Sequence, residues 1–557
     1  MSGKISIQVD ATSLTREVYE IFQNEGAVAS VVFPAAGALP EGSLPEGGET
    51  VAVLDRQTEE EVGTFAEKWA AAGVSVRYAR TEATEIECRA LLQKHFDGAF
   101  TALPEGAEIS PETLVMRRPY NTYALRSLSL KGRTMDEVRA YIDRVKEEDG
   151  YLAFYAAEGT MGVVEELLAY CREAGVEITT TAAVLDAEAC RVKIIREGFD
   201  GQKCYVHARM ATHEDEMLIT AQLLDVRGSD CFDALQSCYS ADGGKSWTGF
   251  HEEENLGLWE MGDTRIAISN ATPLYHKPTG KFMVVGAVVN YEKESLFPLR
   301  ANDPRKVGFY VPYSVFDNKT KKFGACKPIP MPQTEEFRDA GGGCSQCCVT
   351  KDGEILIPVV FSVPWKDDVM QRVRVLRYTF DGEDLELAEV GPEIEVLDDA
   401  WGLAEPSVIC HKGVYYCTLR SKTVGYVCTS LDGTNYSEPT PWVWEDGEEL
   451  TCYNTQTHWL ENESGLYLVY TRKNGKNDHV MRNRAPLYVT KVNTETLALI
   501  REDEFVAVPE RGARLGNFGA FSDGGKEMYV VASEWMQPAG CAAYGSDNAL
   551  WLADVTV

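Results

Sequence analysis

Basic residues are scarce in this chain. Its 557 residues include 54 lysines and arginines against 86 aspartates and glutamates, which gives a formal net charge of −32 at pH 7. A surface with this excess of negative charge repels phosphate backbones and anionic lipid headgroups. The composition therefore argues against nucleic acid and against a membrane surface as partners.

Long apolar runs are also lacking. No segment approaches the roughly 18 apolar residues of a membrane span, and the opening MSGKISIQVDATS has no apolar stretch behind a basic one. The 15 cysteines are an odd number scattered through apparent strands, which is typical of buried free thiols in a reducing compartment. We expect a cytoplasmic protein.

Metal-ligand spacings are lacking too. Cys344, Cys347 and Cys348 form a CxxCC group, but no second pair lies at a zinc-like distance. Buried strand thiols are therefore favoured over a metal site, and no cofactor is expected.

A repeat is present instead. After residue 200 a polar turn followed at once by a short apolar strand recurs six times. Successive copies lie 65, 73, 59, 52 and 62 residues apart when they are aligned on Met217, Phe282, Ile355, Val414, Leu466 and Met528. The copies begin at His213, His276, Thr350, Cys410, Glu461 and Ser522. One small sheet cannot bury both faces unless neighbours stack on it, so the repeat predicts a six-bladed β-propeller, with an irregular β-sandwich as the alternative. Because a propeller gathers the starts of its inner strands at one channel mouth, function is expected just upstream of each copy.

The first 190 residues follow another rhythm. Short β-like runs such as ISIQV, ASVVF and VAVL alternate with helical patterns such as MDEVRAYIDRVKEED. This alternation predicts an α/β domain over residues 1–190, ahead of an all-β domain over residues 191–557.

Both ends of the α/β domain resemble polysaccharide deacetylases. The likeness lies in ISIQVDATSLTREVYEIFQNEGAVASVVFP and in the closing GVVEELLAYCREAGVEITTTAAVL. Asp10-Ala11 replaces the family's aspartate pair, no HxxxH is present, and Tyr155 stands in place of its catalytic histidine. One aspartate cannot supply an open metal site, so the resemblance implies a degenerate, metal-free barrel without deacetylase activity. Generic α/β packing is the alternative.

The sharpest motif of the second domain runs from Ser240 to Trp247. It reads SADGGKSW and has the Asp-box form SxDxGxxW, with weaker copies at Ser430 and Thr379. The serine and aspartate side chains can bond backbone amides across a tight turn, while glycine takes a conformation closed to other residues. The motif, a BNR-type repeat, is specific for propeller architecture and weak evidence for activity.

Segments around the repeats resemble sialidases, in the family's order. Residues 206–247 look like its first blade, with Arg209 opening the inner strand and Arg227 after the next. Residues 404–420 look like the fourth blade, with Glu405 on the inner strand and Arg420 15 residues later. Residues 471–490 look like the fifth. The likeness covers most of residues 200–557 at low identity.

This resemblance implies an acidic-sugar site. Sialic acids and related ulosonic acids carry a carboxylate on the anomeric carbon, which three guanidinium groups can hold. Arg209, Arg420 and Arg484 are the candidates, and Arg482 and Arg472 compete for the third place; a surface ion pair is the alternative for each alone. Further substrate contacts are expected from Arg227, Gln456, His458 and Asn517.

Two carboxylates match the family's catalytic positions. Asp230 matches its acid/base aspartate, which must stay protonated through enclosure or neighbouring carboxylates, and Asp233 is close enough to be confused with it. Glu405 matches the glutamate that polarises the nucleophile, and it could also act as a base for water. A buried glutamate capping a strand turn is the structural alternative.

The family's tyrosine nucleophile is missing. The sixth inner strand reads RLGNFGAF, so Asn517 or Phe518 stands in the tyrosine's place. Asparagine cannot form a covalent glycosyl intermediate, which leaves direct attack by water with inversion, another nucleophile such as Tyr544, or another substrate. Blades one and four face each other across a six-blade ring, so Asp230 and Glu405 could flank a water.

The sequence thus predicts an exo-acting glycoside hydrolase of sialidase type that releases a terminal acidic sugar. The alternatives are a non-catalytic carbohydrate-binding propeller and a lyase or epimerase acting on acidic sugars. Tryptophans 259, 401, 459 and 535 could stack on a sugar ring, although they more often pack between blades. The acidic first domain leaves a homo-oligomer open.

Overall fold

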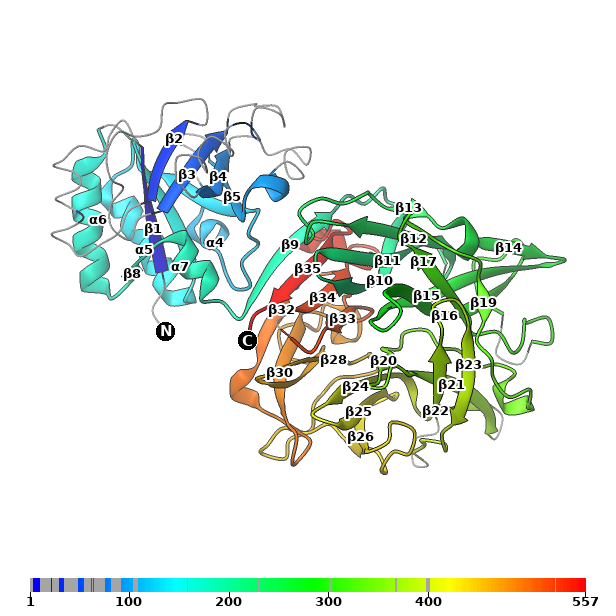
Figure 1. The fold of residues 1–557 in the computed structure, drawn as a ribbon. Helices are drawn as coiled ribbons and strands as arrows, with labels where there is room; N and C mark the ends of the chain where they lie inside the picture. The colour runs from blue at the N-terminus through cyan, green and yellow to red at the C-terminus, as the bar shows by residue number, and fades with distance from the viewer. Residues whose placement is uncertain are drawn as a thin grey trace. The chain divides into compact units, whose positions relative to one another are not determined.

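A computed structural model describes most of the chain (Figure 1). The described residues are 4–10, 22, 30–34, 49–54, 62, 64, 76–81, 92–103, 109–157, 159–228, 230–299, 303–365, 368–396, 401–525 and 527–557. The chain divides into two compact units, residues 1–193 and 194–557. None of the described helices is long and apolar enough to cross a membrane.

The first unit is a closed barrel of seven parallel strands. The ring closes because β1 pairs with β2 on one side and with β7 on the other, and the short β8 also pairs with β1. In chain order the strands are β1 (Lys4–Asp10), β2 (Ser30–Pro34), β3 (Glu49–Leu54), β4 (Val76–Thr81), β5 (Gly98–Ala102), β6 (Leu125–Ser129), β7 (Tyr151–Ala156) and β8 (Glu177–Ile178). The expected α/β domain is therefore a parallel barrel.

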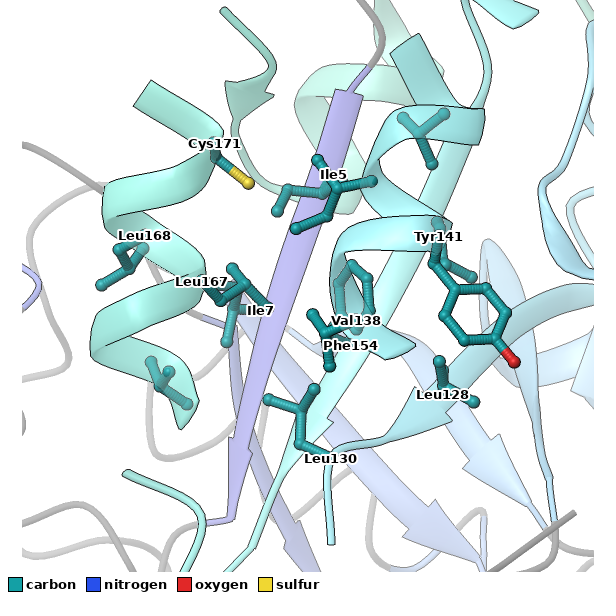
Figure 2. Close-up of a cluster of buried hydrophobic side chains, with 14 of the residues drawn as sticks. Ile5, Ile7, Leu128, Leu130, Val138, Tyr141, Phe154, Leu167, Leu168 and Cys171 are labelled. Carbon is teal, nitrogen blue, oxygen red and sulfur yellow. The ribbon is translucent and has the colours of Figure 1, made fainter. Parts of the chain in front are cut away.

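Two helices pack on β1 of this barrel. α5 (Met135–Glu148) begins at a capping box, in which Thr134 and Glu137 bond each other's backbone N–H, and α6 (Met161–Ala174) ends at Gly175 with φ of 71°. Ile5 and Ile7 lie between the two helices, as Figure 2 shows. The short helices α4 (Pro111–Leu114) and α7 (Thr181–Asp186) also lie in the described part of this unit.

The positions that the deacetylase resemblance singled out are described only in part. Ala11 lies outside the described residues, and Tyr155 on β7 stacks under the guanidinium of Arg80, 3.8 Å from its ring centre. The side chains of Gln8 and Ser127 are both buried, and Ser127 Oγ donates a hydrogen bond of 3.0 Å to Gln8 Oε1.

The second unit confirms the predicted six-bladed β-propeller. Six antiparallel sheets form it, and each predicted turn is the hairpin between the first two strands of a blade. The inner strands are β10 (Lys203–His213), β15 (Thr264–His276), β20 (Cys348–Val349), β24 (Ala404–His411), β28 (His458–Asn462) and β33 (Gly519–Ser522).

The remaining strands build outward from these. The second strands are β11 (Glu216–Asp225), β16 (Lys281–Glu292), β21 (Ile355–Trp365), β25 (Val414–Arg420), β29 (Gly465–Tyr470) and β34 (Met528–Ser533). The third are β12 (Phe232–Ser240), β17 (Pro312–Asp317), β22 (Asp368–Phe380), β26 (Gly425–Ser430), β30 (Leu487–Asn493) and β35 (Leu550–Val555). The outer edges hold β13 (His251–Glu252), β18 (Lys322–Phe323), β19 (Lys327–Pro328), β23 (Leu385–Val390), β27 (Thr440–Pro441), β31 (Ala498–Leu499) and β32 (Phe505–Val508), and β14 (Leu258–Met261) pairs with β15. β9 (Cys190–Arg196) completes the sixth sheet and so closes the ring.

A left-handed residue recurs near the start of the inner strands. The positive φ angles are 55° at His207, 52° at Asn270, 64° at Cys344, 46° at Glu405 and 49° at Asn454. In β10, β15 and β24 this residue sits in a β-bulge, where the strand register shifts. Such backbone is unfavourable for residues other than glycine, and bulges of this kind re-aim side chains next to functional sites.

The turn at Ser240–Trp247 is held by its own side chains. Asp242 accepts hydrogen bonds from the backbone N–H groups of Lys245 and Ser246 at 3.1 and 2.8 Å, and Ser240 accepts one from Gly244 at 2.9 Å. Burial alone would raise the pKa of Asp242, but these bonds outweigh it and lower the pKa. The turn therefore depends on the ionised carboxylate.

We expect Asp242→Ala to destabilise the propeller by about 1–2 kcal/mol, because several donors lose their acceptor. A carboxylate with a lowered pKa stabilises the fold above the unfolded pKa of about 3.9, and this contribution is lost as the pH falls through the folded pKa. Thermal unfolding should show a Tm deficit at pH 7 that narrows in acid. Lys245→Ala, which keeps the backbone donor, is the matched control, and an unchanged Tm for Asp242→Ala would contradict this role.

Candidate functional site

The propeller brings three arginines to one carboxylate. Glu405 lies on β24 and forms an ion pair of 2.5 Å with Arg420 at the end of β25. Arg484 precedes β30, Arg209 lies on β10, and both act electrostatically on Glu405. Segments of three blades that are far apart in sequence thus meet near the bulges of β10 and β24. We call Arg209, Arg420, Arg484 and Glu405 the arginine cluster.

Asn454 links two of these arginines. Its side-chain oxygen accepts from Nε of Arg420 at 2.8 Å, and its carbonyl accepts from Arg484. Arg484 also donates to Thr455 Oγ1 at 3.1 Å and to Asn517 Oδ1 at 3.3 Å. Fixed in this way, the two guanidinium groups lose little further side-chain freedom when they bind an anion.

Arg209 is almost completely buried, with 1% of its surface exposed. It donates to the carbonyl of Phe518 and, at 2.8 Å, to Gln456 Oε1. A Cβ atom at Gly519 would lie 2.9 Å from the Cα of Arg209, and one at Gly516 would lie 2.7 Å from Cδ of Arg484. The two glycines of the segment LGNFG therefore make room for two arginines of the cluster.

A chain of hydrogen-bonded side chains positions the Gln456 oxygen that Arg209 binds. Gln456 Oε1 also lies 3.2 Å from Nε2 of His458, whose Nδ1 lies 2.7 Å from Ser407 Oγ. Burial and the charge of Arg209 lower the pKa of His458 well below its usual value, so the imidazole is neutral. Because the Gln456 oxygen can only accept, Nε2 carries the proton and Nδ1 accepts from the serine.

The cluster carries an excess of positive charge. Burial would raise the pKa of Glu405, but Arg420, Arg484 and Arg209 outweigh it and lower the pKa, so Glu405 is a carboxylate. Burial and the neighbouring Arg420 lower the pKa of Arg484 to about 9, since an unneutralised guanidinium is unfavourable there. An anion would relieve this repulsion.

Three predicted residues lie in ion pairs of their own. Arg227 pairs with Asp225 at 2.6 Å, Asp233 with Lys203 at 2.5 Å and Arg472 with Glu504 at 2.6 Å. Among the described residues none of the three contacts the arginine cluster. A neighbouring opposite charge engages each of them, and their part in the site stays a prediction.

Asp230 lies beside a fourth arginine rather than beside Glu405. Its backbone is left-handed, with φ of 51°, and its carbonyl accepts from the hydroxyl of Tyr291 at 2.5 Å. Burial lowers the pKa of Arg514 to about 10, and Asp230 is the charge that most opposes this shift. Arg482 is exposed and close enough to act on both Arg484 and Arg514.

Sequence reasoning missed three residues of this region. The sequence places Arg514 at the start of RLGNFGAF and predicts a buried thiol at Cys344, but it assigns no role to Arg514 or His207. Cys344 is indeed buried, and it also contacts Arg209 and senses the charge of Glu405. The signal that could have found two of them is the polar-small-polar triplet at the bulges, as in His207-Ala-Arg209 and Cys344-Ser-Gln346.

The remaining candidates have clear places. Asn517 is half-buried on Arg484, whereas Phe518 packs its ring 4.9 Å from that of His458. Tyr544 is 58% exposed and stacks 4.5 Å from His479. The ring centre of Trp401 lies 5.2 Å from the Arg420 guanidinium, and that of Trp535 lies 4.1 Å from the Arg514 guanidinium. Trp459 is fully buried, and Trp259 packs in a blade core.

Two further observations delimit the site. Within the described part of the chain, no group of three or more His, Cys, Asp or Glu side chains is arranged to hold a metal ion. A cavity of about 700 Å³ is lined by later residues of several inner strands, including Thr212, Val408 and Ser522. No residue of the arginine cluster lines this cavity.

The comparisons with known proteins show a similarity of fold only. No family model and no curated protein matches the sequence. Among solved structures, the Trypanosoma rangeli sialidase in complex with the inhibitor DANA is similar, at 13% identity and a TM-score of 0.41, over 63% of this chain and 55% of that one. The phage phi92 endosialidase is similar at 10% identity and a TM-score of 0.43, over 66% and 69%. A Penicillium chrysogenum α-L-arabinanase is similar at 12% identity and a TM-score of 0.40, over 65% and 97%.

Proposed function

We propose that the propeller is an exo-acting glycoside hydrolase that releases a terminal acidic sugar, sialic acid or a related ulosonic acid. The observation that carries the proposal is the arginine cluster: the buried Arg209 and Arg484 and the 13% exposed Arg420, with one carboxylate among them. This surplus of positive charge can bind a carboxylate held on a rigid sugar ring. The charge of −32 does not oppose it, because charges beyond a Debye length of about 8 Å are screened.

The two carboxylates take different parts in this proposal. Glu405 is ionised and buried beside the cluster, which suits a base that activates water. Asp230, on the loop between β11 and β12, is the acid that protonates the leaving oxygen. Asn517 stands where a nucleophile would be needed for retention and is held by Arg484. Water therefore attacks directly, with inversion at the anomeric carbon.

The pH dependence of the reaction follows from Glu405. Its pKa is lowered, so the base is present at neutral pH and is lost only as the pH falls through the folded pKa. We expect the acidic limb of the kcat/KM profile below pH 4.5, the ordinary value for a glutamate. An acidic limb near neutral pH that Glu405→Gln leaves in place would show that another group is the base.

A lectin-like propeller is the second candidate. One observation favours it. An oxygen of Glu405 is engaged in the ion pair with Arg420, which is what is expected of a carboxylate with a purely structural role. A binder would hold the sugar carboxylate in the same arginine cluster and catalyse nothing. For the first unit we propose a degenerate deacetylase-like barrel without activity, and for the whole chain a cytoplasmic location.

Incubation with a panel of sialosides and uronic acid glycosides tests the proposal, with released sugar measured by chromatography. We expect release from at least one ulosonic acid glycoside and none from neutral glycosides. Saturable binding without release would favour the lectin-like propeller. If no acidic sugar binds or is released, the proposed function is wrong.

A further inference from the structure

A second group of polar residues adjoins the arginine cluster. Leu515 donates its backbone N–H to the carbonyl of Arg484 at 2.6 Å, which places Arg514 directly beside that arginine's backbone. The Arg514 guanidinium lies 4.1 Å from the ring centre of Trp535, and the other neighbour of this tryptophan is His207, with ring centres 5.4 Å apart. Arg514, Trp535 and His207 thus form one packed unit.

Gln537 ties this unit to the loop that carries Asp230. Its Oε1 accepts from Arg514 at 3.2 Å and from Nε1 of Trp535 at 2.8 Å, while its Nε2 donates to the carbonyls of Val226 and Gly228 at 2.6 and 2.9 Å. The arrangement of Arg514 against the loop before Asp230 is therefore built by side chains dedicated to it.

Charge is unbalanced across the combined region. Arg209, Arg420 and Arg484 act electrostatically on Glu405. Asp230 acts on Arg514, and Arg482 is close enough to act on both Arg514 and Arg484. Five guanidinium groups thus stand against two carboxylates, and all but Arg482 are largely buried. Buried like charges are unfavourable unless a counter-charge joins them. One sugar carboxylate would leave two guanidinium groups without a counter-charge, and three when Asp230 is protonated to act as the acid.

Several buried polar atoms of the region also make no hydrogen bond within the described part of the chain. They are Nδ1 and Nε2 of His207, Nε of Arg514, Nε of Arg209 and Nε2 of Gln456. His207 is 4% exposed, and burial together with Arg209, Arg514 and Arg484 lowers its pKa well below the usual value. A neutral imidazole offers one donor and one acceptor to a polar ligand. Buried polar atoms without partners are rare in proteins and call for a ligand.

From this geometry we infer that Arg514, with Arg482 and His207 beside it, forms a second anion subsite, and that the preferred substrate carries a second anionic group besides the sugar carboxylate held by the arginine cluster. The inference rests on the proposed function, since the first carboxylate must occupy the arginine cluster. The second group is a carboxylate, phosphate or sulfate, which arginine binds through the same charge-assisted hydrogen bonds. Arg514 is then a specificity-determining residue.

Calorimetric titration with three ligands tests the subsite. Methyl α-sialoside carries one negative charge, α2,8-linked disialic acid carries a second carboxylate on the neighbouring sugar, and sialic acid 9-phosphate carries the second charge on the same sugar. We expect one of the two multiply charged ligands to bind about tenfold or more tightly than the methyl sialoside, and the tighter one identifies the source of the second charge. Arg514→Gln should reduce this preference to about threefold or less, and Arg514→Lys should keep part of it.

Controls separate the possible failures. Arg501→Gln removes one positive charge from an exposed ion pair of the same propeller and should leave all three affinities unchanged. Arg420→Ala should weaken all three ligands alike, which reports on the arginine cluster alone. If Arg514→Gln does not fold, Arg482→Gln, a substitution at an exposed position, replaces it as the test of the second subsite. Equal affinities for the three ligands, or a preference that survives Arg514→Gln and Arg482→Gln, would overturn the second subsite while the proposed function stands. If no ligand binds, the proposed function fails and the subsite fails with it.

Discussion

Under the proposed function, Glu405→Gln and Asp230→Asn should each lower turnover by about 10²–10⁴-fold, the range that one general acid or base contributes, while affinity for the acidic sugar should change little. The amides keep the size of the side chains and remove the ability to accept or donate the catalytic proton. Glu405 is ionised beside Arg420, and Asp230 acts on Arg514, so the two carboxyl groups have different arginine neighbours. Turnover and affinity should therefore separate in both variants.

The comparison needs a matched pair of controls. Glu389→Gln and Asp303→Asn remove carboxylates from exposed ion pairs with Arg377 and Arg305 in the same propeller, so they report on charge loss without touching the site. Steady-state kcat and calorimetric affinity should be measured for all four variants. If Glu405→Gln and Asp230→Asn turn over like the wild type, the two carboxylates are not the catalytic pair.

Arg420→Ala should produce the largest loss of affinity. Arg420 bonds both Glu405 and Asn454, and removing it takes away one clamp on the sugar carboxylate and leaves Glu405 buried without its ion-pair partner. Truncation of one partner in a buried, hydrogen-bonded charge pair costs about 2–5 kcal/mol, so the dissociation constant should rise roughly 30-fold or more.

The same substitution changes the protonation of Glu405. Arg420 is the main influence that lowers the pKa of Glu405 against burial, so without it the pKa should rise. NMR titration of the glutamate carboxyl carbon can follow this shift independently of ligand binding. Arg420→Lys should restore the low pKa in part but not the bidentate grip on the ligand. Wild-type affinity in Arg420→Ala would show that the sugar does not bind at the arginine cluster.

The propeller was predictable because its signal is periodic. Each blade begins with a polar turn between two apolar strands, and this local pattern survives in all six copies, so spacing alone indicates the architecture. The barrel was harder to predict. Its helices and strands alternate visibly, but ring closure depends on β1 pairing with both β2 and β7, which is a long-range contact that no local pattern encodes.

Site residues could be predicted only at the positions where the sequence resembles sialidase blades. Arg209, Glu405, Arg420 and Arg484 come together, yet Arg227, Asp233 and Arg472 have equally suggestive positions and are engaged by nearby opposite charges. Which arginine finds a local partner is decided by side-chain packing rather than by sequence spacing. Arg514 escaped notice for the converse reason, because its neighbours Trp535 and Gln537 lie on the far side of a hairpin.

The most direct test of this account is NMR of the sugar first released from an α-sialoside or a related ulosonic acid glycoside. A site with an arginine cluster, two carboxylates and asparagine in place of a nucleophile predicts release with inversion, so the β-anomer should appear before mutarotation mixes the two forms. First release of the α-anomer would contradict direct attack by water and require a nucleophile elsewhere in the site. No release and no saturable binding would contradict the acidic-sugar site itself.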